Sequence, residues 1–94
     1  MNADVTKIII NQIKKMQSEN EDEGEIWGSS LSSLGLNQEE IPGLIKIAID
    51  KPNTLNIQFE GMKISQGEYL KLVSKLKSQV YNQLDLKIGD IYIK

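Results

Sequence analysis

The longest regular pattern of apolar and polar residues lies in the middle of the chain, over residues 55–84. Apolar and polar residues alternate over 55–59, and the alternation resumes over 62–64 after Gly61. A period of two is typical of a strand with one buried face, and glycine tolerates the positive φ of a tight turn. The pattern therefore predicts a short β-hairpin that leads directly into a helix.

The helix after this hairpin begins with a capping signal. Ser65 is followed three residues later by Glu68, and a serine in this position accepts a hydrogen bond from the backbone N–H at residue 68. The next apolar residues recur at intervals of three and four, so they share one side of a helix that turns about 100° per residue. These residues are Tyr69, Leu72, Val73, Leu76, Val80 and Leu84. We expect this side to face the core.

Two more helices are predicted before the hairpin. The first covers residues 5–17, is capped by Asp4 and leaves Ile10 outside its apolar stripe. The second covers residues 42–50, is apolar over most of its circumference and is expected to be the most buried helix. Residues 29–36, between them, are expected to be irregular or to form one short helical turn.

The last eleven residues predict a second hairpin. Apolar and polar residues alternate over 84–88, and Gly89-Asp90 is suited to a two-residue turn. Residues 91–93 would form the returning strand. Isolated hairpins are marginally stable and need a covering layer. The sequence therefore predicts an α+β fold, with three helices packed on a small antiparallel sheet made of two hairpins, in a single domain spanning residues 1–94.

Residues 18–25 contain five acidic residues and no apolar one. A segment that can bury nothing has little to offset its ordering entropy, so we predict a mobile acidic loop. The alternative is that the whole segment is an acidic decoy for a basic protein surface, as in an inhibitor that mimics nucleic acid, with Glu21, Asp22 and Glu23 as its candidate binding residues. Trp27, the only tryptophan, is interpreted as a pin that covers an edge of the core, with an exposed anchor for a partner as the alternative.

Missing residue types restrict the chemistry of this chain. It has no cysteine, no histidine and no arginine, since all eleven basic residues are lysine. Thiolate nucleophiles, disulfides, Cys-type metal sites and bidentate phosphate contacts are therefore excluded. The acid pairs at 22–23 and 39–40 are adjacent in exposed contexts, and residues 19–25 lack the ligand spacing of a Ca²⁺ loop. We expect neither an enzyme nor a bound cofactor or metal.

Charge is unevenly distributed along the chain. Residues 1–47 contain eight acids and four lysines, a net charge of −4, whereas residues 48–94 contain five acids and seven lysines, a net charge of +2. Lys71, Lys75 and Lys77 lie on the predicted exposed side of the long helix. They would allow weak nucleic-acid binding, but three lysines without arginine are more simply a solubilising surface.

No apolar run approaches the ~20 residues that span a bilayer, and the N-terminus lacks the basic and apolar regions of a secretory signal. We therefore expect a cytoplasmic location and no membrane partner.

Residues 4–80 resemble the acyl carrier proteins in the order of their predicted elements. Leu34-Gly35 match the pair that precedes the phosphopantetheine serine of that family, while Asn37 replaces its aspartate and Gln38 replaces the serine itself. The resemblance implies a carrier-like scaffold that has lost the prosthetic group, with Ser32 or Ser33 as a shifted attachment site.

The leading hypothesis is a small non-enzymatic protein-interaction module, a regulator or inhibitor whose protein partner the sequence does not identify. A carrier-like protein and a weak nucleic-acid binder are the alternatives, and a free sheet edge would also allow a homodimer. The candidate partner-binding residues are Trp27, Glu21, Asp22, Glu23, Lys71 and Lys75.

Overall fold

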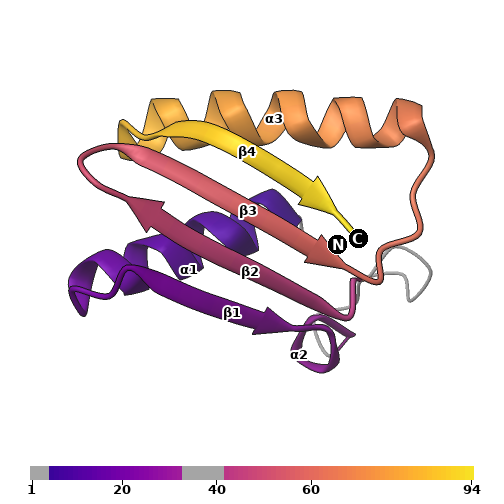
Figure 1. Cartoon of the computed structure of the whole chain (residues 1–94), viewed down its shortest axis with the longest axis horizontal. Helices are drawn as coiled ribbons and strands as arrows, with labels where there is room; N and C mark the ends of the chain where they lie inside the picture. The colour runs from indigo at the N-terminus through magenta and orange to yellow at the C-terminus, as the bar shows by residue number, and fades with distance from the viewer. Residues whose placement is uncertain (1–4, 33–41) are drawn as a thin grey trace.

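The structure is a computed structural model that describes residues 5–32 and 42–94 (Figure 1). In chain order its elements are α1 (Val5–Ser18), β1 (Glu23–Trp27), α2 (Gly28–Ser32), β2 (Leu44–Asp50), β3 (Thr54–Glu60), α3 (Gln66–Leu84) and β4 (Lys87–Ile93). The strands form one mixed sheet in the order β1-β2-β3-β4. The β1/β2 and β2/β3 pairs are antiparallel, and the β3/β4 pair is parallel.

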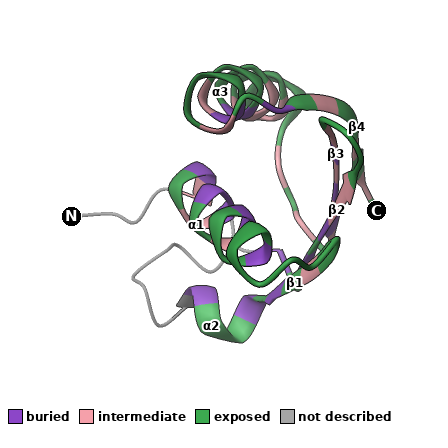
Figure 2. Cartoon of the chain, turned by 90° about the vertical axis from the view of Figure 1, so that its left-hand side faces the viewer, coloured by how far each residue is buried: buried purple, intermediate pink, exposed green. Residues whose placement is uncertain are grey.

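The helices α1 and α3 lie against the same face of the sheet (Figure 2). On the opposite face no described element covers the strands. The result is a two-layer α+β arrangement in which the sheet has one buried and one open face.

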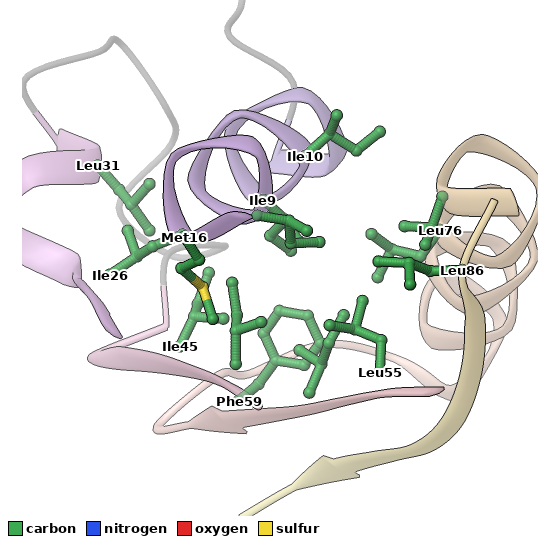
Figure 3. Packing of buried hydrophobic residues seen from close by; sticks show 14 residues of the cluster. Ile9, Ile10, Met16, Ile26, Leu31, Ile45, Leu55, Phe59, Leu76 and Leu86 are labelled. Atoms are coloured by element: carbon green, nitrogen blue, oxygen red, sulfur yellow. The ribbon is translucent and has the colours of Figure 1, made fainter. Parts of the chain in front are cut away.

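The core lies between the sheet and these two helices (Figure 3). Leu55, Ile57 and Phe59 alternate along β3 and point toward the helices, as the period-two pattern predicts. Ile10 of α1, which lies outside the predicted stripe, is also buried. The buried side of α1 is wider than the stripe because α1 packs against α3 as well as against the sheet.

The predicted fold class is confirmed as α+β, but the sheet does not consist of two antiparallel hairpins. The chain passes from β3 through α3 and returns as β4 alongside β3, which makes a parallel pair. A parallel pair requires such a long crossover, and an amphipathic helix is its usual form.

The predicted helix over residues 42–50 is wrong, because this segment contains β2. Ile45, Ile47 and Ile49 face the helices and alternate with Lys46 and Ala48, so the segment has the period of a strand. β-branched isoleucines also favour a strand over a helix. Leu44 and Ala48, which point outward from β2, are also apolar and hide this alternation. The segment therefore has the composition of a helix that is apolar on all sides.

The first predicted hairpin does not form. After β3 the chain turns at Gly61, which has a φ of 77° and whose N–H donates to the carbonyl of Lys94 at 2.9 Å. Residues 62–64 then run outside the sheet toward α3. The antiparallel partner of β3 is β2, which offers a longer ladder than the three residues after Gly61 could provide.

The second predicted hairpin is also wrong, since residues 87–93 form the continuous strand β4. Gly89-Asp90 lies where the β3/β4 register shifts between Leu55 and Ile57. The Asn56 side-chain oxygen accepts a hydrogen bond from the Asp90 N–H there, at 3.0 Å. The Asn56 side chain thus takes the place of a backbone partner for Asp90 at this register shift. In the sequence, Gly89-Asp90 has the composition of a turn.

The predicted start of α3 is confirmed. The Ser65 hydroxyl accepts a hydrogen bond from the Glu68 N–H at 3.3 Å. At the other end Asp85 is left-handed, with a φ of 55°, and its N–H donates to the carbonyl of Tyr81. This cap ends the helix two residues before β4 begins.

The acidic segment predicted as a loop over residues 18–25 is only partly a loop. Residues 23–25 belong to β1, where both glutamates point away from the helices and Gly24 and Ile26 point inward. An edge strand can therefore accommodate acids without burying them. A Cβ on Gly24 would lie 2.7 Å from the Met16 sulfur, so glycine permits the close approach of α1 to β1.

Candidate functional site on the open face of the sheet

The open face is formed by the outward side chains of the four strands, because successive side chains of a strand point to opposite faces. Its members are Glu23, Glu25 and Trp27 of β1, Leu44, Lys46, Ala48 and Asp50 of β2, Thr54, Asn56, Gln58 and Glu60 of β3, and Lys87 and Tyr92 of β4. Polar and aromatic residues thus dominate the surface opposite the apolar core.

One row of side chains crosses the whole open face. Glu25 lies opposite Lys46, Lys46 lies opposite Gln58, and Gln58 lies beside Tyr92. Side chains that face each other on neighbouring strands are within contact distance, so these four form a continuous ladder. The row joins an acid on one edge strand to an aromatic ring on the other.

A shallow hollow of about 360 Å³ lies along this row. Its lining includes Glu23 and Glu25 on one side, Tyr92 on the other, and the short side chain of Ala48 between them. In the register Ala48 lies between Glu23 and Asn56, so its small size leaves space between two longer neighbours. The small side chain of Ala48, in the middle of the sheet, therefore accounts for the hollow.

The charges on the open face are not balanced. The Lys46 ammonium lies 3.6 Å from a carboxylate oxygen of Glu60, so its charge is directed toward β3. Among the residues that the structure describes, neither Glu23 nor Glu25 has an ion-pair partner. The β1 side of the open face therefore carries two carboxylates that form no ion pair with another described residue.

Two aromatic side chains are exposed on this face. Trp27 is 58% exposed and Tyr92 is 52% exposed. The interpretation of Trp27 as a pin that covers the core is wrong, since Ile26 occupies the inward position next to it. Exposed tryptophan and tyrosine on a sheet face have the character of partner-binding residues.

The remaining predicted site residues are divided between two places. Glu21 and Asp22 lie in the turn before β1, where a carboxylate oxygen of Asp22 is 3.7 Å from the Lys51 ammonium. Lys71 and Lys75 lie on the exposed side of α3, in the helical layer. The structure thus brings the acids close to β1 and separates them from the lysines.

Sequence reasoning missed most of the open face. Glu25, Lys46, Gln58 and Tyr92 come from four different strands, and only the register brings them together. Two local signals existed. A period of two places Glu23, Glu25 and Trp27 on one face of a strand, and the alternation over residues 55–59 does the same for Asn56 and Gln58.

A second pair of exposed apolar residues lies on α3. Leu70 is 58% exposed and Tyr81 is 55% exposed. They are eleven residues apart, which places them about 20° apart around the helix axis, on one side of α3. This pair matches Trp27 and Tyr92 in exposure but lies in the other layer.

The described residues show no group of three carboxylates gathered closely enough to hold a metal ion. Within the same residues no helix is long and apolar enough to cross a membrane.

Leu34-Gly35, Asn37 and Gln38, which carry the resemblance to acyl carrier proteins, lie outside the described residues, so that resemblance stays a prediction. Nucleic-acid binding through the α3 lysines also stays a prediction.

Comparison of the chain with protein-family models, with curated proteins and with solved structures finds no match. The functional argument therefore rests on the chemistry and the arrangement of this chain's own residues.

Proposed function

We propose that the chain is a small non-enzymatic protein-binding module, a regulator or inhibitor that engages a partner protein through its open face. One observation carries this proposal: α1 and α3 cover one face of the sheet, while the other presents Trp27 and Tyr92 beside a polar ladder. Aromatic anchors surrounded by polar residues are the usual composition of a protein-binding surface.

The dimensions of the open face favour a protein over a small ligand. Four strands spaced ~4.8 Å apart, each rising ~3.3 Å per residue over up to seven residues, give a face of about 450 Å² in projection. The hollow in it is shallow, whereas small-molecule sites are concave and enclose most of the ligand. A standard interface buries about 800 Å² on each partner, so the face would form the centre of a modest, transient one.

Capture of partners by the immobilised chain tests the proposal. The variant W27A/Y92A removes both aromatic anchors of the open face, and L70A/Y81A removes two side chains of equal exposure from α3. We expect a defined set of captured proteins to be lost with W27A/Y92A and retained with L70A/Y81A. Circular dichroism on both variants would establish that each remains folded.

Two outcomes would contradict the proposal. In one, W27A/Y92A captures the same proteins as the unaltered chain. In the other, L70A/Y81A alone abolishes capture, which would move the binding surface to α3.

A further inference from the structure

We infer that the partner presents a basic surface, and that at least one of its lysine or arginine side chains occupies the hollow beside Glu23 and Glu25. This inference rests on the proposed function and names the chemistry of the partner. The sequence alone leaves an acidic decoy as one alternative, whereas the structure specifies which acids point toward a partner and which do not.

Charge complementarity is the first argument. Glu23 and Glu25 point outward from β1 without ion-pair partners among the described residues, and Lys46 is directed toward Glu60. The turn before β1 adds further acids at residues 19–22. Lys87 lies on the opposite edge strand, β4, and the exposed lysines of α3 lie in the other layer. The β1 side of the open face is therefore negative, which attracts a basic surface and repels an acidic one.

The positions of the aromatic rings are the second argument. Trp27 and Tyr92 are both about half exposed, and aromatic faces attract lysine and arginine cations as well as apolar groups. Glu25 and Tyr92 belong to strands separated by three spacings of ~4.8 Å, a span of about 14 Å. The candidate contacts are thus spread across the full width of the sheet, which fits a surface that carries several basic groups.

The lining between these ends also suits cations. Gln58 presents a side-chain amide in the same row, and amide oxygens accept hydrogen bonds from ammonium or guanidinium groups. Ala48 leaves room next to Glu23 for a long side chain to enter. Glu23 would bind a cation from one side while the hollow accommodates its aliphatic stem.

A second copy of this chain is the competing occupant. Lys71 and Lys75 of one copy could bind the acids of another, but this contact joins two different surfaces. Such head-to-tail contacts generate open chains unless the rotation closes into a ring. Concentration-dependent association of the chain alone, lost in K71Q/K75Q, would overturn our inference in favour of self-association.

Titration with two charged peptides tests the inference. Hexa-arginine and hexa-glutamate are added separately to the ¹⁵N-labelled chain at low salt. We expect hexa-arginine to shift amide signals of residues 23–27, 46–48 and 56–58 and to bind E23Q/E25Q about tenfold more weakly, because two exposed ion pairs are lost. E19Q/E21Q removes the same charge from the adjacent turn without removing a contact in the hollow, so it should weaken binding only about twofold, clearly less than E23Q/E25Q.

Three results would contradict the inference. Hexa-arginine could bind E23Q/E25Q as tightly as the unaltered chain, it could shift only the turn at residues 19–22, or hexa-glutamate could shift the open face. The capture assay separates the two proposals. If W27A/Y92A loses the captured proteins while E23Q/E25Q retains all of them, the protein-binding function stands and the basic partner is wrong.

Discussion

The Tyr69 hydroxyl, in the first turn of α3, donates a hydrogen bond to the backbone carbonyl of Ile91 in β4 at 3.3 Å. The two residues are 22 positions apart, and their contact joins the start of the crossover helix to the strand that follows it. This bond joins α3 to the edge strand β4 and supports the parallel arrangement of β3 and β4.

The variant Y69F tests the strength of this link. It removes the hydroxyl and keeps the ring, so we expect a loss of about 0.5–1.5 kcal/mol in the free energy of unfolding. Urea denaturation measures the change. Y81F on the exposed side of the same helix should change stability by less than about 0.5 kcal/mol. An unchanged free energy of unfolding in Y69F would mean that the Tyr69 hydroxyl contributes nothing to the fold.

Leucine truncation in α3 tests which side of the helix faces the core. Leu76 is fully buried and Leu70 is 58% exposed, so a leucine-to-alanine substitution can be compared on the buried and the exposed side of α3. We expect L76A to cost about 2–5 kcal/mol, a large part of the stability of a domain this size, because it leaves a cavity. L70A should cost less than about 0.5 kcal/mol. Equilibrium unfolding in denaturant distinguishes them, and a reversed order would contradict the packing.

Replacing Gly28 and Gly67 by alanine should change the free energy of unfolding in opposite directions. A Cβ on Gly28 would collide with the backbone carbonyl of Pro42, whereas a Cβ on Gly67 would meet no atom within 4 Å. We expect G28A to lower the free energy of unfolding by about 2–3 kcal/mol through overpacking. G67A should raise it by about 0.5 kcal/mol, since alanine favours a helix. Thermal unfolding of both variants checks the two signs.

An engineered disulfide tests the parallel β3/β4 pair. Gln58 and Tyr92 are register partners on neighbouring strands, a separation within the 4.4–6.8 Å window of Cα distances that disulfides span. The chain has no cysteine, so Q58C/Y92C should form a single intramolecular bond on mild oxidation. Q58C/K77C, with one cysteine on α3, should remain reduced. Non-reducing electrophoresis and mass spectrometry follow the reaction, and a reduced Q58C/Y92C would contradict the register.

Local pattern was sufficient for α3 and for most of α1. The apolar stripe around Leu76 and the Ser65 cap depend only on residues within a few turns, so they can be interpreted without knowing the fold. The isoleucines of β2 alternate in the same local way, but Leu44 and Ala48 occupy outward positions and mask the period.

Strand pairing was not accessible from local pattern. Gly89-Asp90 has the composition of a turn. It continues as part of β4 only because β4 pairs with β3, with a shift in register at these two residues. The candidate site depends on pairing even more strongly. Trp27 and Glu23 could be identified as candidates within β1, whereas Tyr92 joins the same face through three strand pairings.

The central claim is that the open face is the surface that binds a partner. Hydroxyl-radical footprinting of the chain, free and in complex with a captured protein, tests it most directly, because Trp27, Tyr92 and Tyr81 are all exposed and readily oxidised. We predict that the complex protects Trp27 and Tyr92 and leaves Tyr81 on α3 as reactive as in the free chain. Protection of Tyr81, with Trp27 and Tyr92 unchanged, would contradict the claim.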